Sequence, residues 1–376
     1  MRRMRFFMWI YEHQEWPCFT WDNEKLAAEL ADLRHHQGRL LGRMESMGFD
    51  LRREASLTTL TKDVVYSSAI EGEDLNKDEV RSSIARQLGI DIGGLMPKNR
   101  DVEGIVEMML DATQGYALPL TEDRLFSWHA ALFPTGRSGM RWINVAGWRT
   151  AETGPMQVVS GYQGRERIHF EAPHAKKLNS EIKKFLKWFA YNDLVDPVIK
   201  AGIAHLWFVT IHPFEDGNGR IGRAIADMAL AQADQTSDRF YSLSSQIEAE
   251  RKEYYLQLEA AQRGTLDITK WLRWFLACMR RAIDNAEQSL SHTLFKAQLW
   301  DKLNQQNIND RQKLIINKML DLHFKGHMNT SKYAKLAKCS NDTALRDIQK
   351  LKQLGVFIQN ESGGRSTSYR LYKLLQ

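Results

Sequence analysis

One twelve-residue segment, residues 212–223, limits the fold and the chemistry of this chain more than any other. It reads His-Pro-Phe-Glu-Asp-Gly-Asn-Gly-Arg-Ile-Gly-Arg. Pro213 and three glycines disfavour a continuous helix, whereas apolar residues recur at helical spacing over residues 221–231. The segment therefore predicts a loop that ends at a helix N-terminus. Free N–H groups and the positive end of the helix dipole attract anions there, and glycines let a phosphate approach the main chain.

The side chains of this segment fit the same chemistry. The imidazole of His212 titrates near neutral pH and can act as a general base. The carboxylate of Asp216 suits Mg²⁺, and Arg220 and Arg223 can clamp the outer phosphates of a nucleotide. The alternative, a glycine-rich turn with a solvated cluster of charges, does not require all of these groups together.

The segment matches the fixed positions of the signature HPFx(D/E)GN(G/K)Rxx(G/R)R from His212 to Arg220, and a second arginine follows at Arg223, so the chain resembles the Fic family. The resemblance implies transfer of AMP from ATP to a hydroxyl-bearing side chain of a protein, with release of pyrophosphate. It makes His212 the group that takes the proton of the attacking hydroxyl, and Asp216 the ligand of a Mg²⁺ ion that bridges the phosphates. The residues that it assigns to the anionic oxygens of the nucleotide are Gly217, Asn218, Gly219, Arg220 and Arg223.

A second motif, at residues 67–72, resembles the (S/T)xxxE(G/N) pattern of the inhibitory helix that many Fic proteins carry. Ser67 and Glu71 are four residues apart, so they share one face of a helix. The resemblance implies an inhibitory helix over residues 61–72, in which Glu71 pairs with Arg223 and displaces the γ-phosphate of ATP. Such a pair matters only where it is partly shielded from water. Without the first motif, this spacing would indicate an ordinary surface helix.

The pattern of apolar residues predicts an all-α protein with a short β-hairpin and three domains. The resemblances imply a Trp-rich helical domain over residues 1–50, a Fic-type helical core over residues 51–285, and a winged helix-turn-helix domain over residues 291–376. Strand-like residues 156–160 and 167–170 predict the hairpin. Helices are expected over residues 23–47, 56–72, 76–88, 101–117, 121–133, 175–191, 197–211, 221–231, 267–283, 308–322, 330–337 and 341–354.

The hairpin region, residues 154–173, resembles the flap of Fic enzymes, which binds the main chain of a target protein by strand addition. The resemblance implies that an unidentified target protein docks on this flap. It also implies that four flap residues contact the nucleotide: Val158, Val159, Ser160 and Gly161. The alternative is a surface hairpin without a substrate role.

Residues 253–262 resemble the YYxxLEAAN segment that contributes to the adenine pocket of Fic proteins. Tyr254 or Tyr255 can stack on the purine, and core packing is the alternative for both. Gln262 stands where asparagine is frequent in relatives, and it keeps an amide for contact with the base. His205 lies on a largely apolar helix and is expected to be a core residue without a catalytic role.

The C-terminal region carries the basic surplus of the chain. Residues 290–376 contain 15 Lys and Arg against 6 Asp and Glu, whereas the rest contains 37 against 40. This balance indicates an acidic partner for that region alone. Short strands are expected at residues 356–359 and 368–371, around a wing at residues 363–365. Side chains that can reach DNA from the third helix of this region are Thr343, Arg346 and Lys350. Protein docking and homodimerisation are the alternatives.

The remaining features favour a cytoplasmic protein with no membrane partner. The three cysteines have no metal-ligand spacing, and no apolar stretch is long enough to span a bilayer. Three functions stay open. The first is an auto-inhibited, Mg²⁺-dependent protein adenylyltransferase that modifies Tyr, Thr or Ser, with self-modification among its reactions. The second is a Fic-type enzyme in which Glu71 positions water and AMP is removed from a protein. The third is a DNA-binding transcription regulator whose core only senses a nucleotide.

Overall fold

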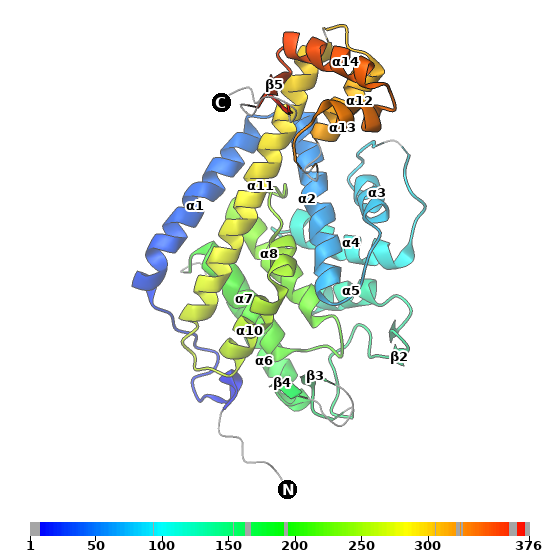
Figure 1. The fold of residues 1–376 in the computed structure, drawn as a ribbon. Helices are drawn as coiled ribbons and strands as arrows, with labels where there is room; N and C mark the ends of the chain where they lie inside the picture. The colour runs from blue at the N-terminus through cyan, green and yellow to red at the C-terminus, as the bar shows by residue number, and fades with distance from the viewer. Residues whose placement is uncertain are drawn as a thin grey trace. The chain divides into compact units, whose positions relative to one another are not determined.

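The computed structural model describes residues 8–92, 94–152, 154–161, 167–191, 195–304, 306–320, 324, 326–360 and 367–372. These residues are mostly helical, with small two-stranded antiparallel sheets (Figure 1). This agrees with the predicted fold class. The chain divides into two units, Met1–Glu287 and Gln288–Gln376, and the finer domain boundaries stay predictions. Within the described part of the chain, no helix combines the length and the apolar character needed to cross a membrane.

The N-terminal part of the first unit consists of successive helices, and most of them begin at a residue whose side chain caps the helix. They are η1 (Ile10–Glu12), α1 (Asn23–Glu45), α2 (Phe49–Ile70), α3 (Lys77–Gln87), α4 (Arg100–Gln114) and α5 (Glu122–Leu132). The side chains of Asp22, Asn76, Asn99 and Thr121 accept hydrogen bonds from N–H groups in the first turns of α1, α3, α4 and α5. Helix α2 begins seven residues before the predicted start at residue 56. Its first residues are largely exposed, so they show no apolar periodicity.

Two hairpins follow. Strands β1 (Arg137–Ser138) and β2 (Arg141–Trp142) form a short hairpin that the sequence did not predict. Strands β3 (Gln157–Ser160) and β4 (Arg167–Glu171) form the predicted antiparallel hairpin, with a register shift between Val158 and Val159. The tip of this hairpin, residues 162–166, lies outside the described residues.

The centre of the first unit is the pair α7 (Pro197–Ile211) and α8 (Asn218–Asp234), which lie side by side (Figure 1). From Val198 onward, every residue of α7 except Lys200 is buried. A Cβ atom at Gly222 would lie 2.8 Å from Cγ1 of Val209, so this glycine permits the close approach of the two helices. The other helices of this region are η2 (Ala175–Lys177), α6 (Leu178–Tyr191), α9 (Leu243–Ala249), α10 (Arg251–Gln262) and α11 (Thr269–Asn304).

The second unit has its own core. After the end of α11 it contains α12 (Asp310–Met319), α13 (Thr330–Ala337), α14 (Asn341–Gln353), β5 (Phe357–Gln359) and β6 (Tyr369–Leu371). Buried Ile315, Tyr333 and Ile348 belong to one apolar cluster. The order of helices and strands follows the prediction, but the winged-helix assignment and DNA binding stay predictions. The expected wing at residues 363–365 lies outside the described residues.

Candidate active site

The candidate base, His212, occupies the residue at which α7 ends. Its backbone is left-handed, with φ 51° and ψ 58°, which turns the chain out of the helix. Nδ1 of the half-buried imidazole lies 3.2 Å from the carbonyl oxygen of Val209. A carbonyl only accepts, so Nδ1 carries the proton and Nε2 is the acceptor in the neutral ring. Burial lowers the pKa of His212 to about 4. The side chain is therefore neutral near pH 7, as a general base must be.

A buried arginine that the sequence analysis did not single out supports this turn. Nε of Arg149 donates to the carbonyl of His212 at 2.7 Å, and Nη2 donates to the carbonyls of Ile211 and Pro173. The backbone N–H of Arg149 donates to the carbonyl of Pro213 at 2.9 Å. One guanidinium thus satisfies the orphan carbonyls at the end of α7 and ties them to the end of the flap. No sequence pattern distinguishes Arg149 from the surrounding polar residues.

The loop between His212 and α8 is closed by its own asparagine. Oδ1 of Asn218 accepts from the N–H of Phe214, and Nδ2 donates to the carbonyl of Phe214, both at 2.9 Å. Asn218 is buried, so its side chain stabilises the loop. Gly217 has φ 80°, and a Cβ atom there would lie 2.9 Å from Cε2 of Phe133. Helix α8 begins at Asn218, three residues before the predicted start, because this closure brings Asn218 and Gly219 into its first turn.

The candidate metal ligand, Asp216, is held by groups from three elements. Its Oδ2 accepts a hydrogen bond from Oγ of Ser138 on β1, and its Oδ1 accepts one from the N–H of Gly217 at 2.6 Å. The backbone carbonyl of Asp216 accepts from Nε2 of His129 on α5 at 3.2 Å. Nδ1 of His129 accepts from the N–H of Ala146 at 3.1 Å, which fixes the tautomer of this ring. Burial lowers the pKa of His129 to about 4, so it holds the loop as a neutral donor.

The carboxylate of Glu71, at the C-terminal end of α2, lies at the N-terminus of α8. Its Oε1 is 2.8 Å from Nη2 of Arg223, whose guanidinium is 1% exposed. Arg223 also donates to Oγ and to the carbonyl of Ser67. A Cβ atom at Gly219 would lie 2.1 Å from Oε1 of Glu71, so only a glycine leaves room for the carboxylate there. Glu71 and Arg223, far apart in the sequence, therefore pair as the resemblance implied, and Ser67 also contacts the same guanidinium.

A second carboxylate, which the sequence analysis missed, holds the other arginine. Nη1 of Arg220 lies 2.6 Å from Oε2 of Glu73, and the guanidinium also lies 5.1 Å from the ring centroid of Phe133. Arg220 is 3% exposed, whereas Glu73 is 46% exposed. Gly72 between the two glutamates has φ 88°, which shapes the turn that presents both. Both candidate phosphate ligands are thus neutralised by one turn of the chain.

The candidate adenine residues differ in their surroundings. Tyr254 is buried, and its OH lies 2.9 Å from Nε2 of His205, which agrees with core packing for both residues. Tyr255 is 38% exposed, and its OH donates to the carbonyl of Ile70 at the end of α2. Gln262 is buried, and its Nε2 lies 3.4 Å from Oγ1 of Thr210, two residues before His212. Of the two tyrosines, Tyr255 is the one that stays accessible to a purine.

The flap lies against the last turns of α10. Arg263 donates to the carbonyls of Ile168 and His169, and Glu259 accepts from Arg167 and from His169. The flap residues that were expected to contact a nucleotide are all exposed: Val158, Val159, Ser160 and Gly161. Arg149 connects the loop to the end of the flap, because it donates hydrogen bonds both to the carbonyl of His212 and to that of Pro173.

Two family models match parts of the chain. Residues 9–90 match a domain of unknown function (DUF4172), and residues 119–230 match the Fic/DOC family. The second match includes His212, Asp216 and both arginines of the loop. The chain contains a Fic domain.

Curated relatives of this Fic domain are named protein adenylyltransferases. The Fic protein of Nematostella vectensis is 31% identical over 114 residues, which are 30% of this chain and 25% of that protein. The fic-1 protein of Caenorhabditis elegans is 30% identical over 119 residues, 31% of this chain and 21% of that protein. The chain thus spans about a quarter of the length of these relatives.

Solved structures support the fold. A Fic family protein from Desulfovibrio desulfuricans G20 aligns over 96% of this chain and 99% of its own, with a TM-score of 0.55 and 19% identity. Fic-1 (residues 134–508) from C. elegans aligns over 71% of this chain and 74% of its own, with a TM-score of 0.50 and 20% identity.

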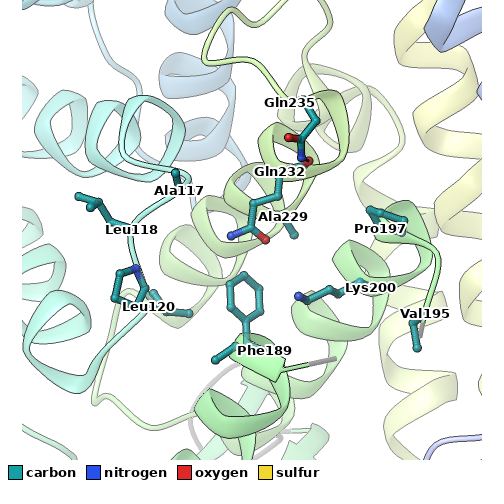
Figure 2. Close-up of a pocket in the computed structure, with 12 residues that line it drawn as sticks. Ala117, Leu118, Leu120, Phe189, Val195, Pro197, Lys200, Ala229, Gln232 and Gln235 are labelled. Atoms are coloured by element: carbon teal, nitrogen blue, oxygen red, sulfur yellow. Dashed lines mark hydrogen bonds between the residues drawn. The ribbon is translucent and has the colours of Figure 1, made fainter. Parts of the chain in front are cut away.

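A separate cavity of about 460 Å³ lies at the other end of α8, and it contains none of the predicted site residues. Phe189, Lys200 and Gln232 point toward it (Figure 2). The ammonium group of Lys200 lies 5.1 Å from the ring centroid of Phe189. The two arginines that were predicted to bind phosphates lie beside Glu71 and Glu73, outside this cavity.

Proposed function

We propose that the chain is an auto-inhibited protein adenylyltransferase, which transfers AMP from ATP to a Tyr, Thr or Ser hydroxyl of a protein. The observation that carries the proposal is the position of Glu71. Its carboxylate lies at the N-terminus of α8, 2.8 Å from Arg223 and in contact with Gly219, where a phosphate would be stabilised. Because the carboxylate of Glu71 is itself an anion held at this helix N-terminus, its position indicates that the same place can bind a phosphate. The names of the curated relatives support the same activity.

The proposed reaction begins when the turn with Glu71 and Glu73 moves away and the phosphates of ATP pair with Arg220 and Arg223. Nε2 of His212 takes the proton of the attacking hydroxyl, whose oxygen forms a bond with the α-phosphorus. The bond from that phosphorus to the bridging oxygen of the β-phosphate breaks, and pyrophosphate leaves. Backbone N–H groups at the start of α8 would stabilise the charge on the oxygens.

Asp216 fits a Mg²⁺ ion, because one well-oriented carboxylate together with phosphate oxygens is a usual ligand set for this metal. Its oxygens are held by Ser138 and Gly217, so little reorganisation is needed. Bound there, the ion would neutralise charge on the phosphates. Within the described residues no group of three or more His, Cys, Asp or Glu side chains could hold a metal by itself, so the nucleotide would complete the site.

The rest of the proposal concerns binding. The target protein would pair with an edge of the β3–β4 flap, where Val158 and Val159 are exposed, and the adenine would lie near Tyr255 and Gln262.

The cysteines of the chain are free, which agrees with the proposed cytoplasmic setting.

Labelled ATP tests the proposal. The full chain, Glu71→Gly, and Glu71→Gly with His212→Ala are each incubated with Mg²⁺ and a whole-cell lysate. We expect strong labelling of lysate proteins only with Glu71→Gly. Glu54→Gln is the matched control, because Glu54 is also on α2 and pairs with Arg81 at 2.7 Å, away from the loop. Absence of label on lysate proteins with Glu71→Gly, or label on them that persists after His212→Ala, would overturn the proposal.

A second candidate is removal of AMP from a modified protein. Both arginines are already paired with glutamates, so the resting site suits a substrate that has a single phosphate better than it suits a triphosphate. Release of AMP from a pre-labelled protein by the unmodified chain, lost in Glu71→Gly, would favour this candidate.

A further inference from the structure

Three polar side chains form a hydrogen-bonded row that the proposed reaction does not use. Oγ of Ser160, at the end of β3, lies 2.6 Å from Nε2 of His169 on β4. Nδ1 of the same ring lies 2.6 Å from Oε2 of Glu259 on α10. A carboxylate only accepts, so in the neutral imidazole Nδ1 carries the proton, and Nε2 accepts the proton of the Ser160 hydroxyl.

This order, a hydroxyl followed by an imidazole and a carboxylate, is the one that activates a serine for attack. The carboxylate is ionised: burial opposes the charge, but hydrogen bonds from His169 and Arg167 lower the pKa of Glu259. Ser160 is exposed, whereas His169 and Glu259 are partly shielded. The nucleophile is therefore accessible, and the groups that activate it are held in place.

Attachment of the flap to α10 does not require the serine. Glu259 already accepts from Arg167 at 2.9 Å and lies 3.2 Å from Nη2 of Arg263. Arg263 also donates to the backbone carbonyls of Ile168 and His169. These contacts hold the hairpin, so the Ser160–His169 hydrogen bond adds chemistry that a plain docking surface does not need.

The row is tied to the candidate active site from two sides. Gln262, one turn after Glu259 on α10, lies 3.4 Å from Thr210, two residues before His212. At the end of the flap, Arg149 donates both to the carbonyl of Pro173 and to that of His212. The base of the hairpin that carries Ser160 and His169 and the helix that carries Glu259 are thus both connected to the turn that holds the candidate base.

We propose that Ser160 is itself an acceptor of AMP, so that the flap is the self-modification site of this protein. The inference rests on the proposed transferase activity. Oγ of Ser160 forms a bond with the α-phosphorus of ATP, the bond from that phosphorus to the bridging oxygen breaks, and pyrophosphate leaves. The proton of Ser160 moves to Nε2 of His169, and Glu259 stabilises the imidazolium. A nucleotide on β3 would then occupy the edge that a target protein needs.

Peptide mass spectrometry of the full-length Glu71→Gly protein, after incubation with Mg²⁺ and ATP, tests the inference. We expect the AMP adduct on Ser160. Adding Ser160→Ala should remove most of the self-label, whereas adding Ser180→Ala, which removes an exposed hydroxyl on α6, should leave it unchanged. Self-label that is undiminished by Ser160→Ala, or an adduct that maps only to other residues, would overturn the inference.

The role of His169 has its own test. In Glu71→Gly with His169→Gln, we expect the rate of adduct formation on Ser160 to fall about a hundredfold, the usual contribution of a general base. The label on lysate proteins is measured in the same reactions. If Glu71→Gly labels lysate proteins but the peptide that contains Ser160 carries no AMP, the inference is refuted and the proposed function stands. If no protein is labelled at all, the proposed function fails.

Discussion

Replacement of Glu71 by Gln should destabilise the free protein and strengthen nucleotide binding. The amide keeps the size of the side chain but removes its charge, so the guanidinium of Arg223 keeps its hydrogen bonds to Ser67 and loses the ion pair with Glu71. Loss of one partner of a fully buried ion pair costs about 3–5 kcal/mol, and exposed pairs contribute about 0–1 kcal/mol. Arg223 is 1% exposed and Glu71 is 32% exposed, so we expect an intermediate cost of about 1–3 kcal/mol.

A nucleotide regains this free energy, because its phosphate supplies the missing negative charge. With a factor of ten for each 1.4 kcal/mol, the affinity for Mg²⁺ and a non-hydrolysable ATP analogue should rise about 5- to 150-fold. Urea unfolding measures the loss of stability, and titration calorimetry measures the gain in affinity.

Two controls make the prediction specific. Glu73 is 46% exposed, so Glu73→Gln should raise the affinity at most about fivefold. Glu54→Gln, which breaks a surface pair with Arg81 on the same helix, should leave the affinity unchanged. If Glu71→Gln binds the analogue no more tightly than the unmodified chain, the coupling between the glutamate and the phosphate site is refuted.

Three further predictions follow from single contacts. Arg149→Lys should lower transfer by the Glu71→Gly enzyme at least tenfold, because an ammonium cannot reach all the carbonyls that the guanidinium holds; an unchanged kcat would contradict this. Gly217→Ala should lower the free energy of unfolding in urea by about 1–2 kcal/mol, because the φ of 80° is strained for alanine and its Cβ would meet Phe133; equal urea midpoints would contradict this. Burial lowers the pKa of His205 to about 4, so between that pH and about 6.5 the unfolded chain binds more protons. Stability should therefore fall as the pH drops through this range, and urea unfolding at about pH 7 and pH 5 should show a smaller fall for His205→Gln.

Much of the fold follows from local patterns. Helix α7 has the predicted bounds, 197–211, because Asp196 caps it and most of its residues up to Ile211 are apolar. The β3–β4 hairpin was also predicted, because glycines separate the short apolar runs of this region, as in strands joined by a turn. The start of α8 was predicted three residues late, because Gly219 has low helix propensity, and only the closure of the loop by Asn218 shows that this glycine is helical.

The pairing of Glu71 with Arg223 was expected from the resemblance, and the structure has the two groups 2.8 Å apart. Glu73 was missed, because nothing in the sequence around it distinguishes it from a solvated surface glutamate. Its pairing with Arg220 appears only where the turn after α2 meets α8. The row from Ser160 to Glu259 was missed for the same reason, since 99 positions separate its ends in the sequence numbering.

The sequence by itself determined the chemical groups of the loop and the helix that follows it, because spacing along a chain dictates local conformation and which groups lie close together within it. Only the tertiary structure decided the state of those groups. Burial at the end of α7 lowers the pKa of His212. Arg149 and His129 hold the loop by its carbonyls, and Glu71 and Glu73 pair with the two arginines of the loop. Those properties depend on solvent exclusion and on contacts between distant segments, and neither is encoded in the spacing of any one motif.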